Sequence, residues 1–350
     1  MNNTIIDEDV KIVLDSDIEF ERFYGKTVLI SGANGYVPSY FAYTFMALND
    51  TYDAGIKVIA LCRNEIKAKE RFAEFVERQD FEILVQDVRN PIETEEKIHF
   101  FIHAASPAGK KSRHDDPVNT FESNVLGLRN MLQVAIKNPC EAFLFLSSVD
   151  IYGDLPGQGR LCENQIGTVD LLNVRNAYSC GKRAAEIMSK AYQIEYELPV
   201  YIVRPFQIIG PGPDLTDGRL HIDFVSQILK SKKIVLKSDG SAVRSFMYIT
   251  DAIKAMFVVM EKGNPGEAYN IVSESGEASV RELAEIFSSN AEADVEIEYD
   301  ISQRTTIEVT EAKSIVIGDS TKLKNLGWSA QISLDEACKR MMNSYGVETK

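Results

Sequence analysis

An α/β fold with a doubly wound parallel sheet is predicted by three features of the sequence. Short apolar runs alternate with longer amphipathic segments from residue 26 to about residue 204, and a glycine-rich turn follows the first apolar run. The 350 residues, 45% hydrophobic and 26% charged, are also sufficient for a large core. Strand–helix–strand repeats form parallel sheets, because the helix between two strands packs on one face of the sheet and brings the chain back to the edge where the first strand began.

The individual elements follow from hydrophobic periodicity. Six apolar runs rich in β-branched and aromatic residues are the expected strands, at residues 26–30, 57–62, 81–88, 99–105, 142–149 and 199–205. Amphipathic segments between them are the expected helices, at residues 39–49, 65–78 and 119–137 and around Tyr178.

The chain divides into three regions. Residues 1–25 form an N-terminal arm, expected to be a short helix, and residues 26–204 form the first α/β domain. Glycine and proline then become frequent at 208–219, and the later elements are shorter. We therefore expect residues 205–350 to form mainly a smaller α/β domain over the carboxyl ends of the strands, where such sheets bind ligands, with some segments returning to the first domain.

Composition excludes several classes of function. The net charge of -14 and the absence of a basic run argue against general binding of nucleic acid. The acidic N-terminus does not resemble a signal peptide, and no apolar stretch is long enough to span a membrane, so we expect a cytoplasmic protein. Five cysteines without a CxxC pair indicate reduced thiols and no metal site.

The turn after the first strand predicts a site for a dinucleotide. Gly32 and Gly35 allow a sharp turn that brings backbone amides at the start of a helix against a pyrophosphate, with Asn34 and Tyr36 in the same turn. Pro38 occupies a position where a third glycine is common, and proline suits a first helical turn. The alternative is a tight loop that binds nothing.

The ends of the next two strands bear on the choice of cofactor. An acidic residue after the second strand usually bonds the ribose of NAD, whereas an arginine accommodates the 2′-phosphate of NADP. Arg63 stands there without an acid, which favours NADP over NAD, although it could be a solvated arginine at a helix start. Asp87 and Val88 end the third strand and could face the adenine, or Asp87 could be a turn residue.

Tyr178 and Lys182 are the strongest candidates for chemistry. Their spacing of four stacks them on one face of a helix, so the lysine ammonium can favour the ionised form of the phenol. With Ser148 they could remove a proton from a sugar hydroxyl. The pair alone is weak evidence, because this spacing also occurs by chance on amphipathic helices.

The order of the motifs resembles the extended short-chain dehydrogenase/reductase family, in particular its nucleotide-sugar epimerases, dehydratases and decarboxylases. The resemblance runs from residue 26 to about residue 337. It rests on the glycine turn at 31–38, Asp87-Val88, HAAS at 103–106, ESNVLG at 122–127, SSVDIYG at 147–153, YSCGK at 178–182, RPFQIIGPG at 204–212 and RSFMYITD at 244–251. It implies a Rossmann-type domain that binds NAD or NADP and a substrate-binding domain for a nucleoside-diphosphate sugar.

The resemblance also assigns roles at the reaction centre. Tyr178 would accept the proton of the sugar C4 hydroxyl, Lys182 would lower the pKa of Tyr178 and hold the nicotinamide ribose, and Ser148 would donate to the reacting oxygen. Ser148 could instead cap a strand end. Ala104 and Ala105 would contact the cofactor.

Six further residues are implied as substrate ligands. Arg219 and Arg244 would bind the diphosphate, since arginine presents forked donors to phosphate oxygens, although either could be a surface ion-pair partner. Gln207 stands where relatives often have asparagine, and Asn124 could equally be a helix-surface amide. The set consists of Ser106, Asn124, Arg175, Gln207, Arg219 and Arg244.

The residues after Ser148 bear on the reaction that comes after C4 oxidation. The 4,6-dehydratases of this family carry an Asp-Glu pair there, whereas this chain has Val149 and Asp150, which disfavours dehydration. UDP-glucuronate decarboxylases resemble this chain in having an acidic residue at the position of Asp150 and an arginine at the position of Arg175. Asp150 could instead be a turn residue, and some dehydratases also have an arginine at the position of Arg175. We therefore favour decarboxylation narrowly, with 4-epimerisation and 4-keto-sugar reduction as alternatives.

Two further expectations concern assembly and activity. The resemblance implies a homodimer in which the helices of Asn124 and Tyr178 pair across a two-fold axis. A non-catalytic protein that only senses the cofactor is a remote alternative, because Ser148, Tyr178 and Lys182 are all present.

Overall fold

The structure is a computed structural model that describes residues 3–107, 115–155, 159–300 and 315–350. Its centre is a seven-stranded sheet in which every neighbouring pair is parallel. The strands run in the order β10 (Ala268–Ile271), β6 (Val200–Pro205), β5 (Ala142–Leu146), β4 (Phe100–His103), β1 (Thr27–Ser31), β2 (Lys57–Cys62) and β3 (Phe81–Val85). The predicted α/β fold with a parallel sheet is confirmed.

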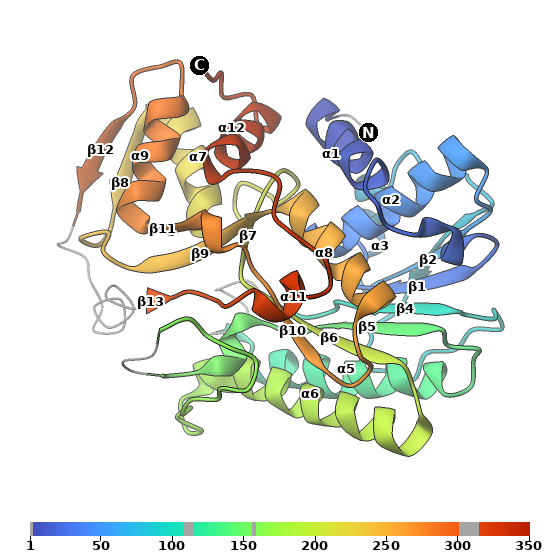
Figure 1. The fold of residues 1–350 in the computed structure, drawn as a ribbon. Helices are drawn as coiled ribbons and strands as arrows, with labels where there is room; N and C mark the ends of the chain where they lie inside the picture. The colour runs from blue at the N-terminus through green and yellow to red at the C-terminus, as the bar shows by residue number, and fades with distance from the viewer. Residues whose placement is uncertain (1–2, 108–114, 156–158, 301–314) are drawn as a thin grey trace.

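Helices cover both faces of this sheet (Figure 1). One face carries α2 (Tyr36–Tyr52) and α8 (Ile249–Lys262), and the other carries α5 (Pro117–Ala135) and α6 (Ala177–Tyr196). Each face has its own apolar core, because strands buried on both sides supply side chains to both. The sheet is therefore buried on both faces, and the loops at its strand ends lie toward the second domain.

One helix is shorter than its pattern predicts. The amphipathic segment 65–78 forms α3 only over Glu65–Arg71. After it, Phe72 and Phe75 turn inward and pack against Phe81 of β3, with ring centroids 5.0 and 5.4 Å away. Burial of these rings outweighs the helical periodicity that continues in the sequence.

The second domain is built from short strands and helices, most of which lie beyond the carboxyl ends of the main sheet (Figure 1). β9 (Val243–Tyr248) is its central strand and pairs with β7 (Gln207–Ile209), β11 (Glu277–Ser279) and β13 (Ile315–Val316). The remaining elements are α7 (Leu220–Ser231), β8 (Lys233–Leu236), α9 (Val280–Asn290), β12 (Glu296–Tyr299), α11 (Thr321–Lys324) and α12 (Leu334–Ser344). The intervening α8 and β10 belong to the main sheet and its cover.

The N-terminal arm is an integral part of the core. It forms α1 (Thr4–Leu14) and a single 3-10 turn, η1 (Phe20–Phe23). Asp9 of α1 is fully buried and accepts hydrogen bonds from the phenols of Tyr40 and Tyr248 and from Arg340 of α12. The arm thus joins α2, the second domain and the C-terminal helix. Among the described residues, no helix is both long and apolar enough to cross a membrane.

Candidate active site

A cleft of about 2010 Å³ lies between the two domains, at the carboxyl ends of the strands. Such sheets bind ligands at this edge, and the volume exceeds the several hundred Å³ that a single small ligand requires. Eighteen of the nineteen residues predicted from the sequence line it, namely Gly32, Asn34, Gly35, Tyr36, Arg63, Asp87, Val88, Ala104, Ala105, Ser106, Ser148, Asp150, Arg175, Tyr178, Lys182, Gln207, Arg219 and Arg244.

The glycine turn forms one wall of the cleft. Gly32 has a positive φ of 65°, and a Cβ there would lie 2.8 Å from the backbone of Ala105, so no other residue fits. Gly35 is the N-cap of α2 and supplies no side chain, which leaves the first amides of the helix open to the cleft. These features fit the pyrophosphate of a dinucleotide.

Basic side chains gather where the second and third strands end. Arg63 is exposed, and Lys67, in the first turn of α3, also lines the cleft. Asp87 is bound by Arg89, whose Nη2 lies 2.8 Å from Oδ2, and this contact, with a smaller effect of Arg63, lowers the pKa of the Asp87 carboxyl. Lys67 was missed, although it stands four residues after Arg63 in the helix that follows the second strand.

The candidate catalytic residues converge from two elements. Tyr178 and Lys182 lie on α6 and are 5% and 2% exposed. The Lys182 ammonium donates to the Leu146 carbonyl at 2.6 Å and lies 5.9 Å from the centre of the Tyr178 ring. Ser148 follows β5, and its hydroxyl caps η2 (Val149–Tyr152) by accepting from the Asp150 amide at 3.1 Å. The Ser148 proton remains available to donate to a ligand.

His103, at the end of β4, keeps a neutral ring beside this centre. It is fully buried, its Nδ1 lies 2.7 Å from the Ser31 hydroxyl, and its ring stacks on Phe145. Burial, with a smaller contribution from Lys182, lowers the pKa of His103 to about 3. Lys182 is therefore the cation at this strand edge.

Asn124 is the one predicted residue that does not line the cleft. It is fully buried on α5, where its amide nitrogen donates to the Thr120 carbonyl and its oxygen accepts from the Ser106 hydroxyl at 2.8 Å. Asn124 thus orients Ser106, which does line the cleft.

Arg219 lies where the second domain meets the glycine turn. Its guanidinium is 5.3 Å from the centre of the Tyr36 ring, and its Nε is 3.0 Å from Asp217. The next residue but one, His221, is buried in the first turn of α7 and was missed, because an isolated histidine carries no motif. Burial, then the charge of Arg219, lowers the pKa of His221 to about 3, so Arg219 carries the positive charge here.

The remaining predicted ligands come from four separate elements around the cleft. Gln207 and Arg244 lie on paired strands β7 and β9, and both are half-buried. Arg175 is exposed in the short turn η3 (Val174–Asn176) directly before α6, and Asp150 lies in η2. Val149, beside Asp150, is buried. Arg175, Arg219 and Arg244 thus bring positive charge to the lining of the cleft, as expected for an anionic ligand of an acidic protein.

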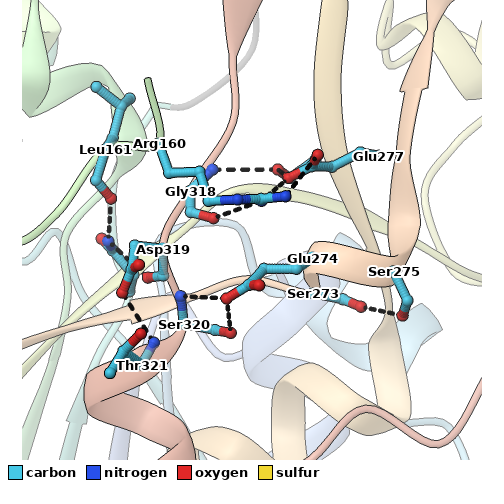
Figure 2. Close-up of polar contacts among 12 residues, drawn as sticks. Arg160, Leu161, Ser273, Glu274, Ser275, Glu277, Gly318, Asp319, Ser320 and Thr321 are labelled. Atoms are coloured by element: carbon cyan, nitrogen blue, oxygen red, sulfur yellow. Dashed lines mark hydrogen bonds and ion pairs between the residues drawn. The ribbon is translucent and has the colours of Figure 1, made fainter. Parts of the chain in front are cut away.

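Polar contacts join residues 160 and 161 to the second domain (Figure 2). Arg160 forms an ion pair with Glu277 of β11 and donates to the Gly318 carbonyl at 3.3 Å. Leu161 exchanges backbone hydrogen bonds with the 317–319 segment, and Glu274 accepts from Ser320. This seam holds the loop around residue 160 against the second domain.

The chain is similar to known proteins in sequence and in fold. The model of the NAD dependent epimerase/dehydratase family matches residues 28–272. UDP-glucuronic acid decarboxylase 2 of Arabidopsis thaliana is 29% identical over 326 residues, which cover 92% of this chain and 68% of that protein.

Two solved structures share the fold. UDP-glucose 4-epimerase of Thermotoga maritima with UDP-glucose has a TM-score of 0.77 at 21% identity, covering 91% of this chain and 98% of that one. RMD of Pseudomonas aeruginosa with NADPH has a TM-score of 0.70 at 22% identity, covering 91% and 98%. Because the family model spans well over half of the sequence and the cleft carries the matching residues, the chain belongs to the NAD dependent epimerase/dehydratase family.

Proposed function

We propose that this protein is a nucleotide-sugar decarboxylase that oxidises a UDP-glucuronate-like substrate at C4 and releases its carboxylate as carbon dioxide. The observation that carries the proposal is that one cleft is lined by the glycine turn, by Ser148, Tyr178 and Lys182, and by arginines from the second domain. The 29% identity to a UDP-glucuronic acid decarboxylase over most of the chain supports the choice of substrate.

The chemistry begins with removal of two hydrogens from C4. Lys182 stabilises the phenolate form of Tyr178, this phenolate accepts the hydroxyl proton, and Ser148 donates a hydrogen bond to the C4 oxygen. A nicotinamide dinucleotide held at Gly32, Gly35 and the start of α2 would supply the hydride acceptor. The product of this step is a 4-keto sugar.

Loss of the carboxylate then follows from the ketone. The carboxylate is β to the keto group, so the bond between C5 and the carboxyl carbon breaks with its electron pair delocalised onto the C4 oxygen. Ser148 stabilises that oxygen, and protonation at C5 completes the step. Arg175 would bind the sugar carboxylate before it leaves, and Asp150, which also lines the cleft, would protonate C5. Return of the hydride to C4, with return of the proton from Tyr178 to the C4 oxygen, would restore the alcohol.

Arg219 and Arg244 would hold the substrate diphosphate, with Gln207 beside them. Arg219 comes from the loop before α7 and Arg244 from β9, so the two guanidinium groups approach from different elements of the second domain. Forked donors of this kind bind phosphate oxygens in pairs.

A test uses the purified protein with a panel of nucleotide sugars and mass spectrometry. We expect loss of carbon dioxide from UDP-glucuronate. Loss of water from a nucleotide hexose would indicate dehydration, and gain of two hydrogens by a 4-keto sugar would indicate reduction. Conversion without a mass change, resolved by NMR, would indicate 4-epimerisation. Any of these without carbon dioxide release from UDP-glucuronate would overturn the proposed subclass.

For the cofactor we propose NADP in preference to NAD. Arg63 and Lys67 line the cleft where the ribose of the adenosine half would lie, and no carboxylate follows the second strand directly. This same observation favours 4-keto-sugar reduction as the second candidate activity, because net reduction usually uses the phosphorylated cofactor. Arg63→Ala should weaken binding of NADP about tenfold and leave binding of NAD unchanged; equal effects on both would remove the preference.

We also propose a homodimer formed through α5 and α6. Large apolar side chains are exposed along these two helices, among them Val118, Phe121, Ile187 and Ile194. Ile187→Asp should convert a dimer to a monomer in light scattering at micromolar concentration. A monomeric protein before substitution would contradict the proposal.

A further inference from the structure

The segment that carries Ser148 is fastened to α6 on both of its sides. Before Ser148, Lys182 binds the Leu146 carbonyl, and the Ser147 hydroxyl donates to Glu186 Oε1 at 2.5 Å. After Ser148, Arg183 Nε donates to the Ile151 carbonyl at 2.7 Å. The helix that carries Tyr178 thus also binds the segment after β5 that carries Ser148.

Glu186 is itself held rigidly. It forms a two-point ion pair with Arg204 of β6, at 3.0 Å from Nε to Oε1 and 2.7 Å from Nη2 to Oε2. Arg204 also donates to the Tyr152 phenol and to the Glu163 carbonyl. Such a pair fixes the carboxylate in position and orientation, which a lone glutamate on a helix surface could not achieve.

The side chain of Arg183 binds three carbonyls at once. In addition to Ile151, its Nη2 donates to Tyr152 at 3.2 Å and to Gly167 at 2.9 Å. A Cβ on Gly153 would lie 2.8 Å from this Nη2 and 2.4 Å from the Thr168 carbonyl, so the turn closes tightly around the guanidinium. Arg183 therefore sets the path of the chain directly after η2.

A contribution to stability alone does not explain why Arg204 and Glu186 form a buried ion pair. Burying an ion pair costs desolvation, and replacing such a pair by apolar side chains is often neutral or stabilising. Here the Arg204 and Glu186 side chains are only 6% and 13% exposed. What the charges do provide is a defined register between α6 and the end of β5.

We propose that Glu186 and Arg183 are positioning residues that hold Ser148 in the geometry needed to donate to the C4 oxygen. Glu186 acts through Ser147, and Arg183 acts through Ile151 and Tyr152. Neither needs to touch the substrate. A hydroxyl displaced by about 1 Å from the reacting oxygen slows hydride transfer up to about a hundredfold without weakening substrate binding.

Two variants test the proposal without leaving a buried charge unpaired. Ser147→Ala removes the hydroxyl that binds Glu186 but keeps the ion pair with Arg204, and Arg183→Met keeps the aliphatic stem of the side chain. Ser189→Ala is the matched control, because Ser189 is fully buried on the same helix and its hydroxyl has no hydrogen-bond partner among the described residues.

The first readout is reduction of the bound cofactor by UDP-glucuronate in a single turnover, followed by absorbance. We expect this rate to fall about tenfold or more in both variants, while KM changes less than about twofold and Ser189→Ala matches the wild type. Rates equal to that of the control would overturn the inference. An increase in KM together with a loss of thermal stability would also overturn it, because that pattern indicates a general structural role.

The second readout is hydrogen exchange of residues 148–152, which needs no substrate. Exchange should be faster in Ser147→Ala and Arg183→Met than in the wild type and in Ser189→Ala, with α6 itself unchanged. Unchanged exchange would contradict the proposal. The kinetic readout rests on the proposed function. A wild type that is not reduced by UDP-glucuronate would remove that function, whereas the exchange measurement would still decide the positioning roles.

Discussion

Two buried tyrosine clusters in this molecule use the same side chain in different electrostatic settings. In the cleft, Tyr178 has the Lys182 ammonium one helical turn away and faces a volume open to ligands. Between the domains, Tyr248 donates to the Asp9 carboxylate at 2.8 and 2.9 Å. Burial, then the charge of Asp9, raises the pKa of the Tyr248 phenol well above its ordinary value, although Arg340 opposes the shift.

Under the proposed function, this difference separates a reactive tyrosine, Tyr178, from a structural one, Tyr248. A phenol beside a cation can give up its proton, whereas a phenol that donates to a carboxylate is held in its protonated form. The first cluster consists of residues close in sequence, and the second joins α1, β9 and α12. Charge type and access to the cleft, rather than burial, distinguish their roles.

The strongest challenge to this comparison is to remove each hydroxyl in turn. Tyr178→Phe should reduce turnover of the nucleotide sugar by about a thousandfold or more, because the proton acceptor is lost, while cofactor affinity stays constant. Tyr248→Phe should leave turnover within about threefold and lower stability by about 1 kcal/mol. Steady-state kinetics and fluorescence titration of the cofactor check both. Similar losses of turnover in the two variants would refute the distinction.

The structural cluster should instead respond in stability. Asp9→Ala removes the hydrogen-bond acceptor of two phenols and the buried carboxylate that pairs with Arg340. Only the exposed Glu8 then pairs with Arg340. The free energy of unfolding should therefore fall by about 3 kcal/mol. Urea denaturation measures this change. In the double variant with Arg340→Met, part of the loss should return, because the charge that lost its partner is gone. A loss below about 1 kcal/mol in the single variant would show that the cluster contributes little.

The same distinction between a residue of the cleft and a structural residue can be tested with two arginines. Arg219→Ala should raise KM for the nucleotide sugar about thirtyfold, equivalent to about 2 kcal/mol, because two charge-assisted hydrogen bonds to a phosphate are lost. Arg78→Ala is the control, since Arg78 pairs with Asp50 and Asp80 and does not line the cleft. Initial-rate measurements give KM for each. Equal KM values in the two variants would exclude Arg219 as a diphosphate ligand.

The smallest expected effect is a pH dependence of stability. Burial raises the pKa of Asp9 from 3.8 to about 6, although Arg340 and the two phenols oppose the shift. The folded state thus binds the proton more tightly than the unfolded state, so this stabilisation is complete below about pH 4 and is lost as pH rises through about 6. Between about pH 5 and 7 the wild type should lose about 1 kcal/mol more than Asp9→Asn in urea denaturation. Parallel pH profiles would contradict the raised pKa.

Local sequence patterns were sufficient for the sheet and for much of the cleft. Glycine spacing placed the turn after β1, and the four-residue spacing placed Tyr178 beside Lys182, because both depend on neighbours in the chain. Glu186 continues the same helical face, eight residues after Tyr178, so its direction could have been predicted. Its partners Ser147 and Arg204 could not, since Ser147 follows β5 and Arg204 lies on β6.

Contacts between distant segments set the remaining features. Nothing near Asp9 in the sequence indicates Arg340, which lies 331 positions later. The early end of α3 likewise depends on Phe81, which packs against Phe72 from the next strand. Such features depend on which distant side chains are buried together, and the hydrophobic periodicity of one segment cannot predict this.

The carboxyl carbon of the substrate offers the most direct test of a decarboxylase in which Tyr178 is the base. UDP-glucuronate isotopically labelled at that carbon is incubated with the wild type and with Tyr178→Phe, and labelled bicarbonate is followed by NMR. We expect labelled bicarbonate with the wild type and none above background with Tyr178→Phe. Absence of label with the wild type, or equal release by both proteins, would contradict this assignment.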